Sequence, residues 1–305
     1  MNYLIKCAVQ HVLSNIPKGE RINLWLQING MKNLPVSETE YKNKTDIAKK
    51  HIEYYKKFNL EGNQDISKIT SFEFGAGFDL IAPLLFSHYG LKDIYCVDIE
   101  DKSSVFLVDN ILKRFSKDKD ISRMNLINYE GTEFLNKEFK SVLKDKYSIH
   151  YKAPMDAAKT NFENNSIDLI STNATFEHIP KNDIVRILKE AYRVLKPGGV
   201  FSNAIDYKDH WAYTDNRLSF YNFLKHSDKK WKYFNPALNY QNRLRHKEHI
   251  ELFESAGFKV KLNLPELPSE KDKVDLSKLE INEYYKNNFT FEELSVLSSF
   301  IVLTK

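Results

Sequence analysis

Cysteine is scarce in this sequence, with two residues, Cys7 and Cys96, among 305. Two cysteines are too few for a disulfide framework or for a zinc site made of thiolates. Cys96 lies in the apolar run 94–97, where a thiol packs as a small apolar side chain. Small disulfide-stapled folds and cysteine-rich zinc domains are therefore excluded.

Long hydrophobic runs are also missing. No stretch approaches the roughly 18 apolar residues of a membrane-spanning helix. The N-terminal region shows no apolar core followed by a small-residue cleavage site of the kind that marks a secreted protein. We therefore expect a cytoplasmic protein without a transmembrane segment.

Neither sign of charge dominates. Lysine and arginine number 45 against 41 aspartates and glutamates, for a net charge of +4, and the two signs are interleaved. A nucleic-acid-binding protein usually carries a concentrated basic patch, so this balance argues against a nucleic-acid partner. The length suits one elaborated α/β domain, or a domain with an appendage.

A turn with two glycines follows one apolar run, but it lacks the third glycine of a dinucleotide-binding fingerprint. An apolar run ends at Gly75 and Gly77, and Asp98 ends the next apolar run 21 residues after Gly77. Glycines let the backbone approach a ligand, and an acidic residue at the end of the second strand accepts hydrogen bonds from ribose hydroxyls. Leu80 stands where a dinucleotide fingerprint has its third glycine. The pattern predicts a nucleoside-bearing cofactor other than a dinucleotide.

Hydrophobic periodicity predicts the order of the elements. The predicted strands are residues 69–74, 94–98, 149–151, 167–171, 200–205, 258–260 and 298–303. The predicted helices are residues 4–13, 37–58, 80–88, 105–115, 134–143, 183–195 and 246–256. Residues 197–199 form a turn before the fifth strand, residues 24–28 fit a strand or a helix, and residues 117–120 and 269–273 are solvated charge runs.

These elements predict an α/β fold with a doubly wound, mostly parallel, seven-stranded Rossmann-like sheet. Residues 1–60 form a helical N-terminal appendage, and residues 61–305 form the main domain with an aromatic insertion at 206–246. The appendage is a lid, a dimer contact or packing alone, and these alternatives stay open. The oligomeric state is not predicted.

Five motifs in order resemble those of class I S-adenosylmethionine-dependent methyltransferases, in the small-molecule group. They are Glu73-Phe74-Gly75-Ala76-Gly77, the acidic Asp98, Asp156-Ala157 with the run 162–169, Asn173-Ala174-Thr175-Phe176-Glu177-His178, and Leu195-Lys196-Pro197-Gly198-Gly199. Thr160-Asn161 replaces the family's usual Leu-Pro, so the loop there can differ. The resemblance covers residues 66–205 well and the last strands loosely, and it does not reach the first 60 residues.

The resemblance implies S-adenosylmethionine as the cofactor. Asp98 would bind the ribose, Asp156 would accept from the adenine amine, and the Ala157 N–H would face a ring nitrogen. The full set of cofactor-binding residues implied is Glu73, Gly75, Ala76, Gly77, Asp98, Ile99, Asp156, Ala157 and Asn173.

His178 is the leading candidate for a general base, because an unperturbed imidazole has a pKa of about 6.5 and suits proton removal near neutrality. Asp206 and His210 follow the fifth predicted strand and are rival bases. A metal ion bound by Glu177, His178 and Asp206 is an alternative, but no dense cluster of ligands supports it, and we assign no metal.

The insertion supplies the predicted acceptor site. Trp211 and Tyr213 lie among its aromatic residues, and the guanidinium forks of Arg243 and Arg245 fit a carboxylate or phosphate. The alternative for both arginines is a surface ion pair with Glu248 or Glu251. We expect O-methylation of a small molecule, or of a glycan or nucleotide-sugar precursor in polysaccharide biosynthesis.

Two other functions compete with this interpretation. One is methylation of RNA or another macromolecule, although Ser171-Thr172-Asn173-Ala174 differs from the N-P-P-Y type used on base amines. The other is a non-catalytic, cofactor-binding scaffold subunit, which the intact glycine turn argues against. Turnover of S-adenosylmethionine separates an enzyme from a scaffold.

Overall fold

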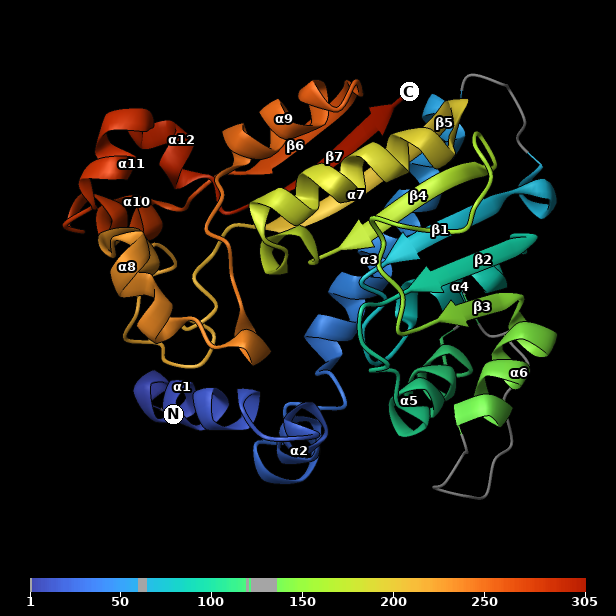
Figure 1. Ribbon diagram of the computed structural model, residues 1–305, viewed down its shortest axis with the longest axis horizontal. Coiled ribbons are helices and arrows are strands. Elements are labelled where there is room, and N and C mark those ends of the chain that lie inside the picture. The colour runs from blue at the N-terminus through green and yellow to red at the C-terminus, as the bar shows by residue number, and fades with distance from the viewer. Residues whose placement is uncertain (1, 60–64, 119–120, 122–135) are drawn as a thin grey trace.

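The structure is a computed structural model that describes all residues except 1, 60–64, 119–120 and 122–135. Its centre is a seven-stranded sheet with the order β3-β2-β1-β4-β5-β7-β6 (Figure 1). The strands are β1 (Thr70–Phe74), β2 (Asp93–Val97), β3 (Ile149–Lys152), β4 (Ile167–Asn173), β5 (Leu195–Asp206), β6 (Lys259–Glu266) and β7 (Ser298–Thr304).

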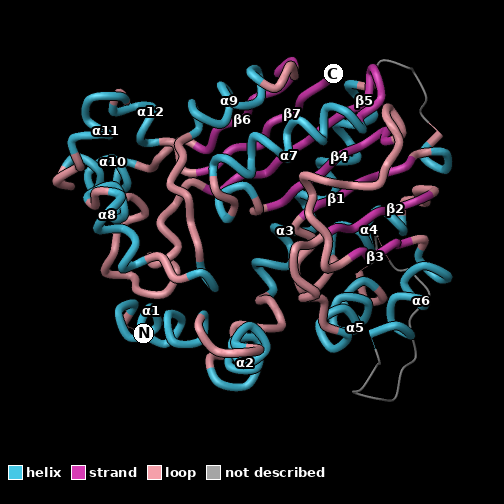
Figure 2. The backbone as a smooth tube through the Cα atoms, viewed as in Figure 1, coloured by secondary structure: helices cyan, strands magenta, loops and turns pink. Residues whose placement is uncertain are grey.

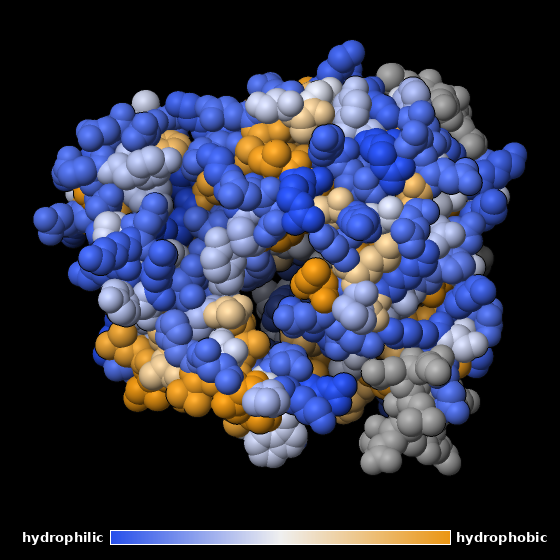
Figure 3. Space-filling model, in the orientation of Figure 1, coloured by the Kyte–Doolittle hydropathy of each residue, from blue (hydrophilic) through white to orange (hydrophobic). Residues whose placement is uncertain are grey.

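Strand direction confirms the predicted fold class. The first five strands pair in parallel, and β7 runs antiparallel between β5 and β6. The strand order reverses between β1 and β4, which places a topological switch point at their carboxyl ends. The arrowheads of β1, β2 and β4 point toward the middle of the molecule in Figure 1, and Figure 3 shows a hollow in the surface there.

Helices cover both faces of the sheet, as the near-continuous apolar strands require. One core lies under α3 (Glu38–Phe58), α4 (Ile81–His88), α5 (Val105–Phe115) and α6 (Asn136–Tyr147). The other core lies under α7 (Lys181–Val194) and α9 (His246–Ser255). Alternate strand residues divide between the two cores: Phe72 and Phe74 face α7, whereas Cys96 faces the first group.

Helix ends follow the sequence signals closely. Ser37 caps α3 by accepting the Glu40 N–H at 3.2 Å, and Gly90 and Gly257 follow α4 and α9 with φ values of +83° and +95°. All seven predicted strands are confirmed within a few residues, except that β6 extends well beyond residue 260. The predicted start of α6 at residues 134–135 lies outside the described residues.

One local prediction needs correction, and two others become definite. Residues 197–199 lie within β5 instead of forming a turn before it; they make an irregularity opposite β4, so the strand begins at Leu195. Residues 24–28 are helical, one of the two predicted alternatives, and belong to the end of α2 (Gly19–Trp25) and to a helical turn, Leu26–Gly30. Residues 269–273 are largely exposed, as predicted for a solvated charge run, and they open a helix, α10 (Glu270–Ser277), through the reciprocal capping box of Ser269 and Asp272.

The N-terminal segment divides into two parts. Helix α3 packs on the sheet, where Ala48 and Ile52 join the first core, and the appendage of residues 1–60 stays a prediction. Helix α1 (Tyr3–Ser14) instead contacts the insertion: Lys6 Nζ donates to Thr214 at 3.0 Å, and His11 bonds the Tyr233 carbonyl.

A third, smaller core lies beside the sheet. It joins α1, the insertion and three short helices that the periodicity did not predict, α10, α11 (Glu283–Asn288) and α12 (Phe291–Ser295). The tube in Figure 2 shows how much of this region is loop. Besides short 3₁₀ turns, the insertion holds α8 (Asp228–Trp231). Among the described residues, no helix is both long and apolar enough to cross a membrane.

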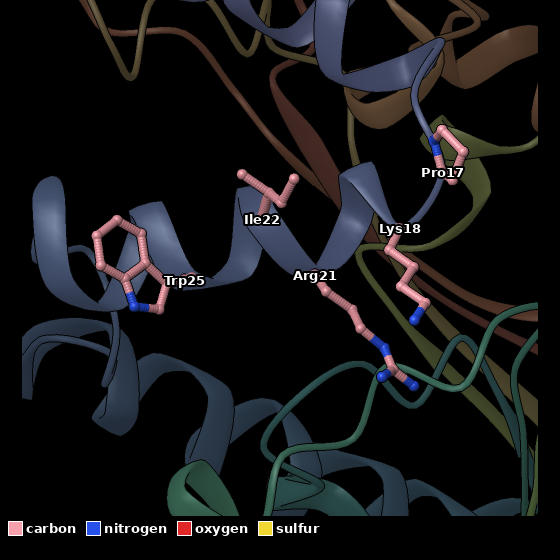
Figure 4. A pocket seen from close by; sticks show the side chains of 5 residues that line it. All are labelled: Pro17, Lys18, Arg21, Ile22 and Trp25. Atoms are coloured by element: carbon pink, nitrogen blue, oxygen red, sulfur yellow. The ribbon is translucent and has the colours of Figure 1, made fainter.

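The outer surface of the N-terminal helices is partly apolar. Leu4, Ile5, Val9 and Val12 of α1 are exposed, and an apolar patch occupies the corresponding corner of Figure 3. A surface pocket at α2 is shown in Figure 4, and its lining residues are Pro17, Lys18, Arg21, Ile22 and Trp25. No predicted site residue lines this pocket.

Candidate functional site

The two glycines after β1 serve different purposes. Both have a positive φ, +71° at Gly75 and +70° at Gly77, which favours glycine. A Cβ on Gly75 would lie 2.3 Å from the Thr175 side chain, whereas a Cβ on Gly77 would meet nothing within 4 Å. Gly75 therefore permits close packing of two loops, and Gly77 borders open space that a ligand can enter.

Asp98 lies directly beside this turn. Its carboxylate accepts hydrogen bonds from the N–H groups of Gly77 at 3.4 Å and Glu100 at 3.2 Å. Burial raises the pKa of Asp98, with smaller opposing effects from Lys102 and the two N–H donors. The neighbouring Ile99 is exposed and offers an apolar surface at the same strand end.

Glu73 lies beneath the glycine turn and is buried. Burial, followed by the nearby Asp79, raises the pKa of Glu73 to about 8. Lys44 of α3 reaches Asp79 at 2.8 Å and ties that helix to the turn. The sequence analysis missed Lys44 and Asp79, and the Asp-to-Lys separation of 35 residues gave no signal for the pair.

The remaining predicted cofactor residues lie on adjacent loops. Asp156 follows β3, accepts the Ala158 N–H at 2.8 Å and pairs with Arg186 of α7 at 3.0 Å. Asn173 ends β4. The structure thus brings all nine predicted residues to the carboxyl ends of β1 to β4, on both sides of the switch point.

The three predicted catalytic residues meet at the ends of β4 and β5. His178 ends a short 3₁₀ turn, Phe176–His178, and its ring centroid lies 4.9 Å from that of His210. His210 Nε2 lies 3.4 Å from a carboxylate oxygen of Asp206, which also accepts the Tyr213 hydroxyl at 2.6 Å. Tyr213, predicted as an acceptor residue, therefore lies at the catalytic cluster.

The electrostatics of this cluster follow from its burial. His178 is exposed, and desolvation by the surrounding protein atoms, followed by the charge of His210, lowers the pKa of His178 to about 4. Burial alone would raise the pKa of Asp206, but contacts with His210 and Lys208 lower it overall. Burial first, and Asp206 second, raise the pKa of Glu177 well above its usual value.

Three consecutive residues of the insertion hold both histidine segments in place. The Tyr240 carbonyl accepts from His178 Nδ1 at 2.7 Å, so that nitrogen carries the proton. Gln241 accepts the His210 N–H at 3.3 Å and donates to the Lys208 carbonyl at 2.6 Å. The Asn242 side chain donates to the Phe176 and Ile179 carbonyls at 2.7 and 2.8 Å. We call residues 240–242 the clamp.

Arg243 and Arg245 do not face the acceptor space. Arg243 is buried and bonds the carbonyls of Phe223 and His226 as well as Asp228. Arg245 is fully buried, and its guanidinium bonds the carbonyls of Tyr207, Leu294 and Val296 at 2.6 to 2.8 Å. The expectation that these arginines bind an anionic acceptor is corrected, because both guanidinium groups are occupied by backbone carbonyls of the protein and, for Arg243, by Asp228.

Trp211 needs a similar correction. It is 2% exposed, its indole N–H donates to the Phe234 carbonyl at 2.8 Å, and its ring packs beside Tyr3 of α1. Trp211 therefore supports the third core, and Tyr213, which is 59% exposed, stays a predicted acceptor residue.

The same cluster brings together groups that can ligate a metal ion. One ligand atom each of Glu177, His178 and His210 lies within 4.8 Å of the others. The sequence analysis had considered Asp206 in place of His210 and had assigned no metal. The sequence does not show that His210 lies near His178, because this depends on the path of the insertion, which brings the two together across 32 residues of chain.

Comparison with known proteins identifies the central part of the chain. Residues 72–202, somewhat less than half of the sequence, match the model of a family described as a methyltransferase domain. A comparison with curated proteins found no match.

Solved structures of similar fold have low sequence identity. An S-adenosylmethionine-dependent methyltransferase from Methanosarcina mazei is 14% identical, with 78% of this chain and 93% of that one covered and a TM-score of 0.42. A phosphoethanolamine N-methyltransferase from Haemonchus contortus is 16% identical, with 84% and 52% covered and a TM-score of 0.44. Geranyl diphosphate C-methyltransferase from Streptomyces coelicolor is 11% identical, with 89% and 86% covered and a TM-score of 0.45. At these values the likenesses carry no argument about the acceptor.

Proposed function

We propose that this chain, whose residues 72–202 match a methyltransferase-domain family, is a class I S-adenosylmethionine-dependent methyltransferase that methylates a hydroxyl group of a small molecule. S-adenosylmethionine is the methyl donor. The acceptor class is our proposal, and it follows from the chemistry of the cluster at the ends of β4 and β5.

The position of His178 relative to the cofactor turn carries the proposal. Thr175 packs against Gly75 of that turn, and its carbonyl accepts the His178 N–H at 2.9 Å. An imidazole is thereby held one short turn away from the space beside Gly77. An O-methyltransferase needs a base there, since a neutral hydroxyl must lose its proton during methyl transfer.

Each predicted site residue has its own role in the proposed reaction. Asp98 holds the ribose of the donor with Ile99 beside it, Gly75 and Gly77 receive the methionine part, and Asp156 and Ala157 hold the adenine. Glu73 lies under the turn that receives the amino acid part. Because Nδ1 of His178 is protonated and bonded to the Tyr240 carbonyl, Nε2 has the free lone pair.

The reaction is an in-line displacement at the methyl carbon. The acceptor O–H bond breaks and its proton passes to His178 Nε2. The oxygen forms a bond to the methyl carbon while the sulfur–methyl bond breaks. The electron pair of that bond stays on sulfur, and the sulfonium becomes a neutral thioether. Alignment of the two reacting groups supplies much of the acceleration.

The acceptor proposed here is uncharged. The buried arginines remove the reason for an anionic substrate, so a phenol, an alcohol or a neutral sugar fits better than a phosphate-bearing precursor. Tyr213 and the insertion form one wall of the acceptor site, and α1 supports that wall from outside through its bonds to residues 214 and 233. A role in polysaccharide biosynthesis requires a neutral sugar acceptor.

The proposal is tested by replacing His178. His178→Ala should lower methyl transfer to a panel of phenols, alcohols and neutral monosaccharides by about 10²–10⁴-fold. Binding of S-adenosylhomocysteine, measured by calorimetry, should stay near the wild-type value. His88→Ala on α4, away from the cluster, is the matched control and should keep full activity. An active His178→Ala enzyme would disprove the role of this residue as the base.

A further inference from the structure

Glu177 is a buried carboxylate that no side chain among the described residues hydrogen-bonds. It is 2% exposed, and its oxygens have only the nearby backbone N–H groups of Glu177 and Asp206 to offset its burial. A carboxylate removed from water without compensation is costly, so such a group normally faces a cation or carries a proton. The oxygen-bearing end of Glu177 belongs to the same group of ligand atoms as His178 and His210.

From this arrangement we infer a binding site for one divalent zinc ion, held by Glu177, His178 and His210. Two imidazoles and one carboxylate suit zinc better than magnesium, which prefers oxygen ligands alone. Three protein ligands with a fourth position left open are the arrangement of catalytic rather than structural zinc sites.

The surroundings of both histidines fit metal ligation. Metal-bound histidines usually present their second nitrogen to a carbonyl or carboxylate. His178 presents Nδ1 to the Tyr240 carbonyl at 2.7 Å, and His210 presents Nε2 to Asp206 at 3.4 Å. His178 therefore keeps Nε2 for the ion, and His210 Nε2 has no hydrogen-bond partner among the described residues.

The potential ligand atoms of the cluster lie somewhat farther apart than the ligands of a bound zinc ion. Ligands about 2.0–2.1 Å from a tetrahedral zinc ion lie roughly 3.4 Å from one another, whereas here the spread reaches at most 4.8 Å. A contraction of up to about 1.4 Å, within reach of side-chain rotation, is needed. The clamp bonds His178 and backbone groups but not the Glu177 side chain, so rotation of that side chain can make this adjustment.

This inference rests on the proposed function, because the ion would take over from His178 the activation of the acceptor hydroxyl. When bound, the ion would supply Lewis-acid chemistry: it would lower the pKa of an acceptor hydroxyl at the open position, and the proton of that hydroxyl would leave to solvent water. Glu177, His178 and His210 would hold the ion, so His178 would serve as a ligand instead of as the base. The methyl group would still pass to the acceptor oxygen, with the neutral thioether as leaving group.

Metal binding is tested without any acceptor. Wild-type protein treated with chelator is titrated with Zn²⁺ by calorimetry and with Co²⁺, whose visible absorption reports tetrahedral coordination. We expect one equivalent of either ion. Glu177→Gln and His210→Ala should each lose that equivalent while binding S-adenosylhomocysteine as before. His246→Ala, whose ring bonds Asn263 outside the cluster, should bind one equivalent.

A variant of the outer partner makes the test sharper. Asp206→Asn should weaken Co²⁺ binding by about 10–100-fold while leaving the stoichiometry at one. Absence of Zn²⁺ binding to the wild type would overturn the inference, and so would binding that persists unchanged in both ligand variants. If chelated enzyme keeps full methyl transfer and His178→Ala remains inactive, the proposed function stands with His178 as base and the metal is excluded from it.

Discussion

At the scale of single residues, the two glycines after β1 illustrate how one motif combines a structural and a functional demand. In the sequence they are equivalent members of one pattern. In the structure a side chain at Gly75 would overlap Thr175, which carries the turn with Glu177 and His178, whereas Gly77 faces open space. Gly75 thus joins the glycine turn to the turn that carries His178, and Gly77 borders open space.

This difference predicts that valine has different effects at the two positions. Gly77→Val should abolish binding of S-adenosylhomocysteine in calorimetry, because the branched side chain fills cofactor space, and should lower the melting temperature modestly through its positive φ. Gly75→Val should lower the melting temperature much more, because its Cβ would lie 2.3 Å from Thr175. Wild-type ligand affinity in Gly77→Val would contradict the assignment of the cofactor site.

At the scale of elements, the clamp shows what the sequence analysis could and could not predict. In the sequence, the two charged arginines of residues 240–245 predict an anion-binding site. Their guanidinium groups are internal braces, and the functional contribution of the segment comes from the neighbouring amides and a backbone carbonyl. Hydrogen bonds to backbone carbonyls leave no pattern in a sequence, because almost any residue type offers the carbonyl.

The strands and long helices were predictable for the opposite reason. Their apolar residues recur with the periods of strand and helix, and capping residues such as Ser37 mark the ends. The region of α10 to α12 lacks this regularity: its helices are short and mostly polar, and they are stabilised by packing against the insertion. Likewise, His210 joined His178 only through the path of the insertion.

Replacing Asn242 of the clamp should lower the rate of catalysis without changing the affinity for the cofactor. Asn242→Ala leaves the Phe176 and Ile179 carbonyls without their partner and should cost about 1–3 kcal/mol of unfolding free energy. The turn that carries His178 should then lose its fixed position, so kcat should fall while S-adenosylhomocysteine affinity stays unchanged. Asn239→Ala in the same segment is the control. A loss of cofactor affinity equal to the loss of kcat would show that the clamp has no specific role in catalysis.

At the scale of the whole molecule, α3 connects the N-terminal region to the centre of the sheet through a buried histidine. His51 Nδ1 lies 2.6 Å from the Ser202 hydroxyl of β5, and the ring packs between Phe86 and Phe300. Burial lowers the pKa of His51 to about 3, so the native protein keeps this imidazole neutral. Protonation of His51 therefore opposes the packing of α3 on the sheet.

The free energy of unfolding should consequently decrease in acid. Between pH 6.5, where an unfolded histidine titrates, and about pH 3, the unfolded chain binds one proton more at this position than the native protein does. This contribution is complete above pH 6.5 and is lost as the pH falls, at a limit of about 1.4 kcal/mol per pH unit. Glu73, whose raised pKa of about 8 favours the native state at lower pH, acts in the opposite direction. The His51 effect is isolated by comparing urea unfolding of wild type and His51→Gln from pH 5 to 7.5. The variant should be less stable at pH 7.5 and should lose less stability than the wild type on acidification. Parallel curves for the two proteins would mean that His51 does not couple protonation to the packing of α3.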